Sequence, residues 1–341
     1  MERIKVLESF PEPRSTTNPY IHLLAAALRS TPSIELQTFS WRTALRGDFD
    51  VFHLHWSDPL LAGRTPVSRL GKRIAMALFL TRLRTRRTPV VRTRHNVKPH
   101  EGSLVAMWVE RRFDRLTTAS IVLNDASAAI PPATVIRHGH YRDWFEPYAR
   151  TDRVPGRLAF VGLIRPYKGV EGLIEAYGEL AASHPDVSLS ISGRPRTEKL
   201  GAAIASAVED LPGVDVSLEY VDDATFVRAV TASSLVVLPY RSMENSGAAL
   251  AALSLDRPVL VPRNPVTEAL REEVGGEWVQ LFDGDLTARD LDAALTSAAL
   301  VQGSPEFIDR DWGDVGDRHH RVFTAARTQL PQRQGMRKDT A

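Results

Sequence analysis

Short apolar runs alternate with longer amphipathic segments along most of the chain. Apolar runs typical of buried strands occupy residues 3–9, 34–41, 50–56, 89–96, 157–163, 187–195, 214–221 and 235–240. Between them, apolar residues recur at helical spacing in residues 18–30, 67–85, 169–185, 197–213 and 247–256. Strands that alternate with helices of this length are typical of parallel sheets covered by helices on both faces. We therefore predict an α/β protein.

The alternation is interrupted once, at the polar segment 148–157, which contains Pro155 and Gly156 and is typical of a linker. The same pattern restarts after it, and a length of 341 residues also indicates about two domains. We predict two Rossmann-like domains that face each other across a cleft, residues 1–150 and 151–328. Residues 329–341 are polar and are expected to form a disordered tail.

The composition excludes several classes of protein. The chain has no cysteine, which excludes disulfides, thiol catalysis and thiolate metal sites. No run reaches the 18 or so apolar residues of a membrane-spanning helix, and the N-terminus has no apolar signal core. We expect a cytoplasmic protein.

Charge is divided unevenly between the two halves. Residues 1–150 hold 23 Lys and Arg against 13 Asp and Glu, whereas residues 151–341 hold 20 against 28. Residues 59–100 contain eleven basic residues and no acidic one. Within them, segment 64–87 joins Arg and Lys to an apolar stripe, Ile74, Met76, Ala77, Leu78, Phe79, Leu80 and Leu83. This pattern predicts a helix that contacts an anionic membrane, and the alternative is a helix packed in the core with solvated ends. Aromatic residues are not interleaved with the cations, which argues against nucleic acid.

Ligands of open α/β sheets bind beyond the carboxyl ends of the strands, so the loops after the strands of the second half are candidate sites. After the first of these strands come Gly162, Arg165 and Lys168, and after the second come Gly193 and Arg194. Two cations beside the start of a helix suit a diphosphate. The alternative is that they are solvated cations on an ordinary loop.

A third loop runs into residues 247–256 through Glu244, Asn245, Ser246 and Gly247. Small residues at a helix start expose backbone N–H groups and allow a ligand to approach closely. Asn245 or Ser246 could equally cap the helix. Glu244 could accept hydrogen bonds from ribose or sugar hydroxyls. The three loops together are a more specific signal of a ligand site than any one of them.

These loops carry a resemblance to a known family. The sequences FVGLIRPYKGVEGLIEAYGEL, HPDVSLSISG and LVVLPYRSMENSGAALAALSLDRPVLVP, within residues 157–262, resemble the donor-binding half of nucleotide-sugar glycosyltransferases of the GT-B fold. These belong to the large retaining family that includes mannosyl- and glucosyltransferases. The segments HLHW, RHNVKPHE, HGHYRDWF and NSGAALAALS are similar to those of bacterial exopolysaccharide and glycolipid enzymes, including GDP-mannose-dependent 4-β-mannosyltransferases that act on lipid-linked oligosaccharides.

The resemblance implies roles for particular residues and departs from the family at two points. His95 stands where the family's histidine reaches the donor sugar, which makes it the catalytic candidate. The family's second glutamate is absent, because Ala252 stands eight positions after Glu244. Leu163 replaces the usual Arg, whose role Arg165 could take. These departures leave open whether the anomeric configuration is retained or inverted.

An inverting enzyme needs a base near the acceptor. The candidates on the acceptor side are Asp58, His100 and Glu101, and Asn18 could bond a sugar or cap a helix. His53 and His55 alternate on one strand and share a face, where they are either core or site residues. No metal ligand set is evident, and Asp283-Gly-Asp285 is typical of a polar turn.

We therefore expect a glycosyltransferase, with mannose from GDP-mannose as the best candidate donor and a lipid-linked or glycan acceptor of cell-surface polysaccharide or glycolipid synthesis. No metal or other cofactor is expected. The protein would lie in the cytoplasm, peripheral at the inner face of the plasma membrane. The alternatives are another GT-B enzyme, such as a nucleotide-sugar epimerase, or a catalytically weak nucleotide-sugar binding protein.

Overall fold

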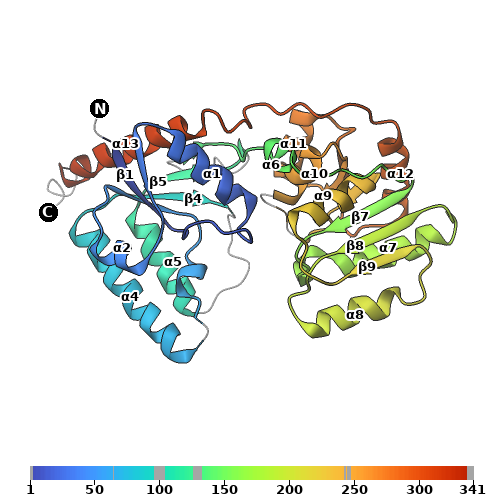
Figure 1. Cartoon of the computed structure of the whole chain (residues 1–341), viewed down its shortest axis with the longest axis horizontal. Coiled ribbons are helices and arrows are strands. Elements are labelled where there is room, and N and C mark those ends of the chain that lie inside the picture. The colour runs from blue at the N-terminus through green and yellow to red at the C-terminus, as the bar shows by residue number, and fades with distance from the viewer. Residues whose placement is uncertain are drawn as a thin grey trace. The chain divides into compact units, whose positions relative to one another are not determined.

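The computed structural model describes residues 3–63, 65–95, 104–125, 133–241, 243 and 247–335. The chain divides into two compact units (Figure 1). The first comprises Met1–Gly139 and Asp311–Ala341, and the second His140–Arg310. Each unit is built on one six-stranded parallel sheet, as the alternating pattern predicts.

The sheet of the first unit has the strand order β2-β1-β3-β4-β5-β6. Its strands are β1 (Ile4–Glu8), β2 (Ile34–Gln37), β3 (Val51–Leu54), β4 (Val90–Arg94), β5 (Thr117–Val122) and β6 (Ala133–Val135). Its helices are α1 (Pro19–Ser30), α2 (Trp41–Arg46), α3 (Asp58–Leu61), α4 (Pro66–Thr85), α5 (Leu104–Leu116) and α13 (Val315–Gly335). Segment 34–41 was expected to be one strand, but the strand ends at Gln37 because Ser40 caps α2.

The core of this unit is aromatic. Phe52 of β3 meets Phe79 of α4 edge-on, with ring centroids 4.9 Å apart, and Phe113 of α5 lies at 5.9 Å from Phe52. Burial of such rings is the main stabilising contribution, on the order of 1.5–3 kcal/mol for each side chain. α4 therefore directs one face into the core.

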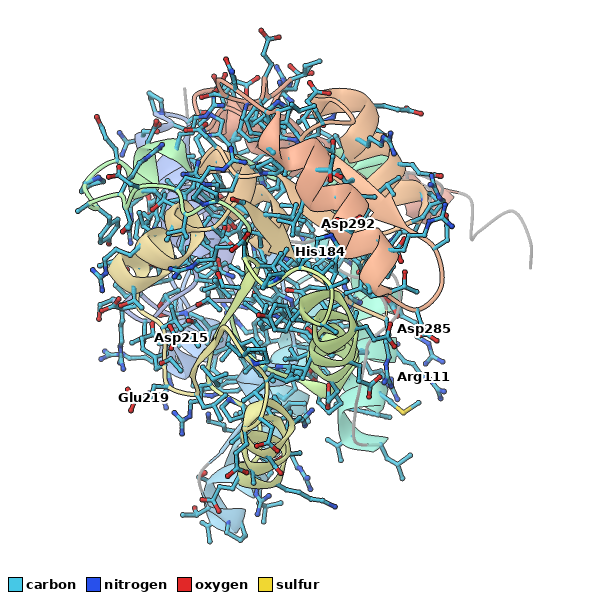
Figure 2. All side chains as sticks on the ribbon, turned by 90° about the vertical axis from the view of Figure 1, so that its right-hand side faces the viewer. Arg111, His184, Asp215, Glu219, Asp285 and Asp292 are labelled. Atoms are coloured by element: carbon cyan, nitrogen blue, oxygen red, sulfur yellow. The ribbon has the colours of Figure 1, made fainter. Side chains whose placement is uncertain are left out.

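The sheet of the second unit has the order β12-β11-β10-β7-β8-β9. Its strands are β7 (Arg157–Val161), β8 (Ser188–Ser192), β9 (Val214–Ser217), β10 (Leu235–Val237), β11 (Val259–Pro262) and β12 (Val279–Phe282). Its helices are α6 (Arg142–Phe145), the 3₁₀ turn η2 (Pro166–Lys168), α7 (Val170–Ala181), α8 (Glu198–Val208), α9 (Asp223–Ala232), α10 (Gly247–Ser254), α11 (Pro265–Val274) and α12 (Ala288–Ala299). Figure 2 looks onto this unit, where His184 just after α7 lies beside Asp292 of α12, 3.4 Å apart.

The predicted domain boundaries differ from the observed ones in two places. The chain leaves the first unit at Gly139 rather than at residue 150, and it returns to that unit at Asp311. α13 packs on α1 and on β1, β4 and β5, burying Val322, Phe323 and Ala326. Part of the expected tail, residues 329–335, is helical because it continues α13. Residues 336–341 lie outside the described residues.

Candidate functional site

In each sheet, the chain leaves the first strand of the unit toward one edge of the sheet and later returns to build the other edge. The place where the direction reverses is a topological switch point, and ligands of open α/β sheets bind there. In the second unit the switch point lies between β7 and β10. The loop after β7 holds Gly162, Arg165 and Lys168, and the segment after β10 leads to Tyr240. The predicted donor loops after β7 and β10 therefore lie at the switch point of their sheet, and the loop after β8 lies next to it.

The loops after β7 and β8 are joined along their backbones. Ile164 donates its N–H to the carbonyl of Arg194 at 3.0 Å, and Arg196 donates to the carbonyl of Ile164 at 2.9 Å. Gly193 is required because a Cβ there would lie 1.8 Å from the Gly162 oxygen. Gly162 has φ 131°, a backbone conformation that glycine tolerates best. The side chain of Arg194 is exposed.

Lys168 and Arg165 form a cationic pair at the end of β7. Both are half-buried, and neither makes an ion pair within the part of the chain that the structure describes. The Lys168 Nζ lies 4.9 Å from the ring centroid of Tyr240. Burial, together with repulsion from Arg165, lowers the pKa of Lys168 to about 8. Two cations without a counterion make a site for an anion such as a diphosphate.

Tyr240 was not predicted as a site residue. Its hydroxyl is buried and has no hydrogen-bond partner among the described residues, and burial raises its pKa. A buried hydroxyl without a partner, on a ring that a lysine contacts, is typical of a group that bonds a ligand. The sequence signal for it was only its place at the end of an apolar strand.

The third predicted loop is only partly described. Gly247 begins α10, whose residues from Ala249 to Ser254 are buried, so the small residues allow this helix to pack in the core. Glu244, Asn245 and Ser246 lie outside the described residues. Arg241 donates its N–H to the carbonyl of Tyr167 at 2.8 Å, which ties this loop to the one after β7.

In the first unit the switch point lies between β1 and β3, where buried polar side chains gather. Glu8 ends β1, and His53 and His55 come from β3 and the residue just after it. The Glu8 carboxylate lies 2.8 Å from His53 Nδ1 and 3.2 Å from His55 Nε2. Burial opposes its ionisation, but the two histidines outweigh burial and lower its pKa to about 2. Glu8 was missed because one acid at a strand end carries no sequence signal.

His95, the predicted catalytic residue, joins this group. Its Nε2 lies 3.0 Å from His55 Nδ1, and its ring stacks on Trp56 with centroids 3.9 Å apart. The ring of Tyr20 meets it edge-on at 5.4 Å. Burial, followed by the neighbouring histidines, lowers the pKa of His95 well below its ordinary value, and burial lowers that of His55 to about 4. Both imidazoles are therefore neutral at pH 7.

The remaining predicted residues do not join the His95 group within the described residues. Asn18 caps α1 by accepting the N–H of Tyr20 at 2.9 Å, so the capping alternative is confirmed. Asp58 is exposed at the start of α3, and burial, together with Glu110, raises its pKa. His100 and Glu101 lie outside the described residues.

Two groups of acids bear on metal binding. Asp283 and Asp285 form the predicted turn around Gly284, and Asp283 accepts a hydrogen bond from Arg263 at 2.8 Å (Asp285 is labelled in Figure 2). Glu8, His53 and His55 offer ligand atoms within 4.8 Å of one another. However, both ring nitrogens of His53 are already bonded, to Glu8 and to Thr93 Oγ1 at 2.8 Å each. The group is therefore best described as a hydrogen-bonded cluster.

Comparisons with known proteins agree with this arrangement. Residues 155–297, which contain the cationic pair, match the family model "Glycosyl transferases group 1". The chain is 41% identical over 336 residues to the GDP-mannose:glycolipid 4-beta-D-mannosyltransferase of Xanthomonas campestris pv. campestris, covering 95% of this chain and 93% of that protein.

Solved structures show the same fold at low identity. Sucrose-phosphate synthase from Thermosynechococcus elongatus has a TM-score of 0.61 and 14% identity, covering 99% of this chain and all of that one. Anabaena HepE in complex with UDP has a TM-score of 0.59 and 14% identity, covering 98% of this chain and all of that one. The predicted GT-B fold is thereby confirmed.

The alternatives of an epimerase or a weak binding protein are not favoured, because the likeness in sequence is to transferases over nearly the whole chain. The chain belongs to the glycosyltransferases, with a group 1 domain in its second unit and full-length similarity to the mannosyltransferases of Xanthomonas.

Proposed function

We propose that this enzyme transfers mannose from GDP-mannose to a glycolipid acceptor and forms a β linkage. The observation that carries the proposal is 41% identity over 95% of the chain to a relative named for that reaction. The uncompensated Lys168 and Arg165 support it, because they suit the diphosphate of a nucleotide sugar. GDP-mannose is an α-glycoside of phosphate, so a β product requires inversion at the anomeric carbon.

The test compares donors and then products. GDP-mannose, UDP-glucose and ADP-glucose are each titrated while the melting temperature is followed, since a ligand of the folded state raises it. Transfer of labelled mannose to a lipid-linked oligosaccharide fraction is then measured, and the anomer is assigned by NMR. GDP-mannose should stabilise the protein most and be incorporated as a β-mannoside. Preference for a donor with another nucleobase, or no incorporation of mannose into lipid, would contradict the proposal.

We further propose that the enzyme works at an anionic membrane surface through residues 64–87, without a metal ion or other cofactor. The observation is that α4 is apolar on two faces. Met76, Phe79, Leu80 and Leu83 are buried, whereas Val67, Leu70, Ile74 and Leu78 are exposed at 55–81%. Arg69, Arg73 and Arg84 of the same helix are also exposed. An exposed apolar stripe with flanking cations is typical of an interfacial helix.

A neighbouring helix extends this surface. α5, which packs beside α4 (Figure 1), exposes Leu104, Met107 and Trp108. Arg112 lies over the Trp108 ring at 5.0 Å, and Arg111, labelled in Figure 2, is exposed. The sequence pattern predicts only the segment 64–87, so the part of the surface on α5 comes from the structure. Across the described residues, no helix is long and apolar enough to cross a membrane.

Not every cation of the segment is available to lipid. Arg82 is half-buried, donates to the Ala44 carbonyl at 2.6 Å and lies over the Phe49 ring at 4.6 Å. It stabilises the packing of α4 on α2, so a variant that tests the membrane must leave it intact. The test variant has Arg69, Arg73 and Arg84 changed to Gln. The control variant removes the same number of charges from the second unit, with Lys199, Arg271 and Arg289 changed to Gln.

The measurement is co-sedimentation with neutral vesicles and with vesicles of 30% or so anionic lipid, at low and high salt. Each cation near such a surface contributes about 1 kcal/mol, so the first variant should lose binding roughly 100-fold at low salt. The control should bind like the unaltered protein, and salt should weaken both. Equal loss in the control would show that net charge alone is responsible and would contradict a specific surface.

A further inference from the structure

The cluster at the ends of β1, β3 and β4 fixes where its protons lie. The Glu8 carboxylate only accepts, so His53 Nδ1, 2.8 Å from Oε1, must carry a hydrogen. The other ring nitrogen of His53 lies 2.8 Å from the Thr93 hydroxyl, with which it shares a hydrogen bond. The carboxylate therefore sets the tautomer of His53.

The position of the hydrogen on His55 in turn determines the tautomer of His95. His55 Nε2 lies 3.2 Å from Glu8 Oε2, and the structure gives neither atom a hydrogen bond to any described residue. We place the hydrogen of His55 on Nε2, because the carboxylate is the charged group nearest to that nitrogen. His55 Nδ1 then carries a lone pair, and it accepts a hydrogen bond from His95 Nε2–H at 3.0 Å. A neutral His95 in this arrangement bears its lone pair on Nδ1, which is the basic nitrogen.

The three side chains Glu8, His55 and His95 differ in their exposure to solvent. Glu8 and His55 are fully buried, whereas His95 is half-buried at the end of β4. The Trp56 ring stacked on His95 and the Tyr20 ring at its edge hold the imidazole in place. The chain thus runs from a partly accessible base inward to a buried carboxylate at the switch point of the sheet.

We propose that His95 is the general base that deprotonates the acceptor hydroxyl. His55 and Glu8 are positioning residues that fix the tautomer of His95 and stabilise the positive charge that His95 gains. This inference rests on the proposed function, because only inversion at the anomeric carbon needs such a base. The role differs from the contact with the donor sugar that the sequence resemblance implies for His95.

The acceptor oxygen forms a bond to the anomeric carbon, and its proton passes to His95 Nδ1. The bond from the anomeric carbon to the diphosphate oxygen breaks, and the electron pair leaves with GDP. His95 holds this proton as an imidazolium, and the Glu8 carboxylate stays ionised and stabilises the positive charge through His55. After the product leaves, one proton is released to solvent.

Other titratable groups face this chain and could change its pH response. Tyr20 comes from α1, His138 from the segment after β6, and His319 from α13, with its ring 5.5 Å from that of His53. Burial lowers the pKa of His319 to about 3, so this ring is neutral near pH 7. Within the described residues, Glu8 is the carboxylate that lies against His53 and His55. Replacing it should therefore change the pH profile more than any of the others.

The experiment uses the full chain with Glu8→Gln, His55→Gln and His95→Ala, and Thr93→Val as the matched control. Thr93 touches His53 but is not part of the chain to His95. Glu8→Gln should lower kcat on the order of 100-fold, within the usual range for general-base catalysis. The affinity for GDP-mannose should stay within about twofold. The acid limb of kcat/KM should move to lower pH, because the anion that favours an imidazolium is gone.

Two further readouts separate a positioning role from a structural one. Added imidazole should restore part of the transfer by His95→Ala, and Thr93→Val should lower the melting temperature but keep kcat. The proposal is overturned if Glu8→Gln keeps wild-type kcat and pH profile, if Thr93→Val loses kcat equally, or if the product is an α-mannoside. If the unaltered protein prefers another nucleotide sugar, the proposed donor is wrong, and the same variants are compared with that sugar.

Discussion

Lys168 combines a charge with a half-buried position against the Tyr240 ring, and its lowered pKa follows from that burial and from Arg165. Replacing Lys168 with Met keeps its length and removes the charge, so donor affinity should fall on the order of tenfold or more. In the unaltered protein, affinity should also fall as pH rises through about 8, since the amine loses its proton there. Isothermal titration with GDP-mannose from pH 6 to 9 measures both effects.

The control is Lys199→Met, on the exposed start of α8. Unchanged affinity in Lys168→Met, or a pH dependence that persists in that variant, would place the diphosphate elsewhere.

His319 shows how burial makes stability depend on pH. Burial lowers its pKa to about 3, and its Nε2 has no partner within the described residues. The unfolded chain therefore binds a proton below about pH 6.5 that the folded chain does not, so stability is full above pH 6.5 and falls as the pH drops toward 3. His319→Leu should remove this pH-dependent loss of stability, so the variant should be more stable than the unaltered protein at pH 4.5.

Urea unfolding at pH 7.5 and 4.5 measures the change. The difference between the unfolding free energies of His319→Leu and the unaltered protein should be larger at pH 4.5 than at pH 7.5, by about 1 kcal/mol or more. A constant difference would mean that His319 is protonated in the folded protein.

At the scale of elements, α13 approaches α1 closely because residue 316 has no side chain. A Cβ at Gly316 would lie 1.8 Å from Thr31 Oγ1 and 2.7 Å from the Ala27 carbonyl. Gly316→Ala should therefore cost about 1–3 kcal/mol of stability through overpacking. Gly313→Ala is the control, since no atom lies within 4 Å of the Cβ that it would add. Thermal unfolding compares the two, and equal melting temperatures would contradict close packing at Gly316.

At the scale of the whole molecule, the chain begins and ends in the same unit. A chain that stops after Arg310 would lack the helix that buries Phe323 and Val322 against the first sheet. Hydrogen exchange in residues 19–30 should then become much faster, because α1 loses its neighbour, while residues 157–161 of the second sheet keep their protection. A chain that stops after Gly335 serves as the control. Unchanged exchange in residues 19–30 would mean that α13 adds little to this unit.

The sequence by itself determined the parallel α/β architecture, because the periods of its apolar residues are local properties of strands and helices. It also predicted the loops with Gly162, Arg165 and Lys168, since ligand sites at strand ends follow from the class of fold. The packing of Arg82 against Phe49 removes one cation from the proposed membrane surface. This packing depends on a contact with a distant segment and has no local pattern in the sequence.

Only the tertiary structure decided which unit α13 joins and which residues surround His95. Glu8 ends β1, whereas His55 and His95 directly follow β3 and β4, so neighbouring members of the group are 40 or more positions apart in the sequence. Their pairing depends on the order of β1, β3 and β4 in the sheet, which alternation alone does not specify. The identity of a buried polar cluster is therefore a property of strand order, whereas the existence of the strands is a property of the sequence pattern.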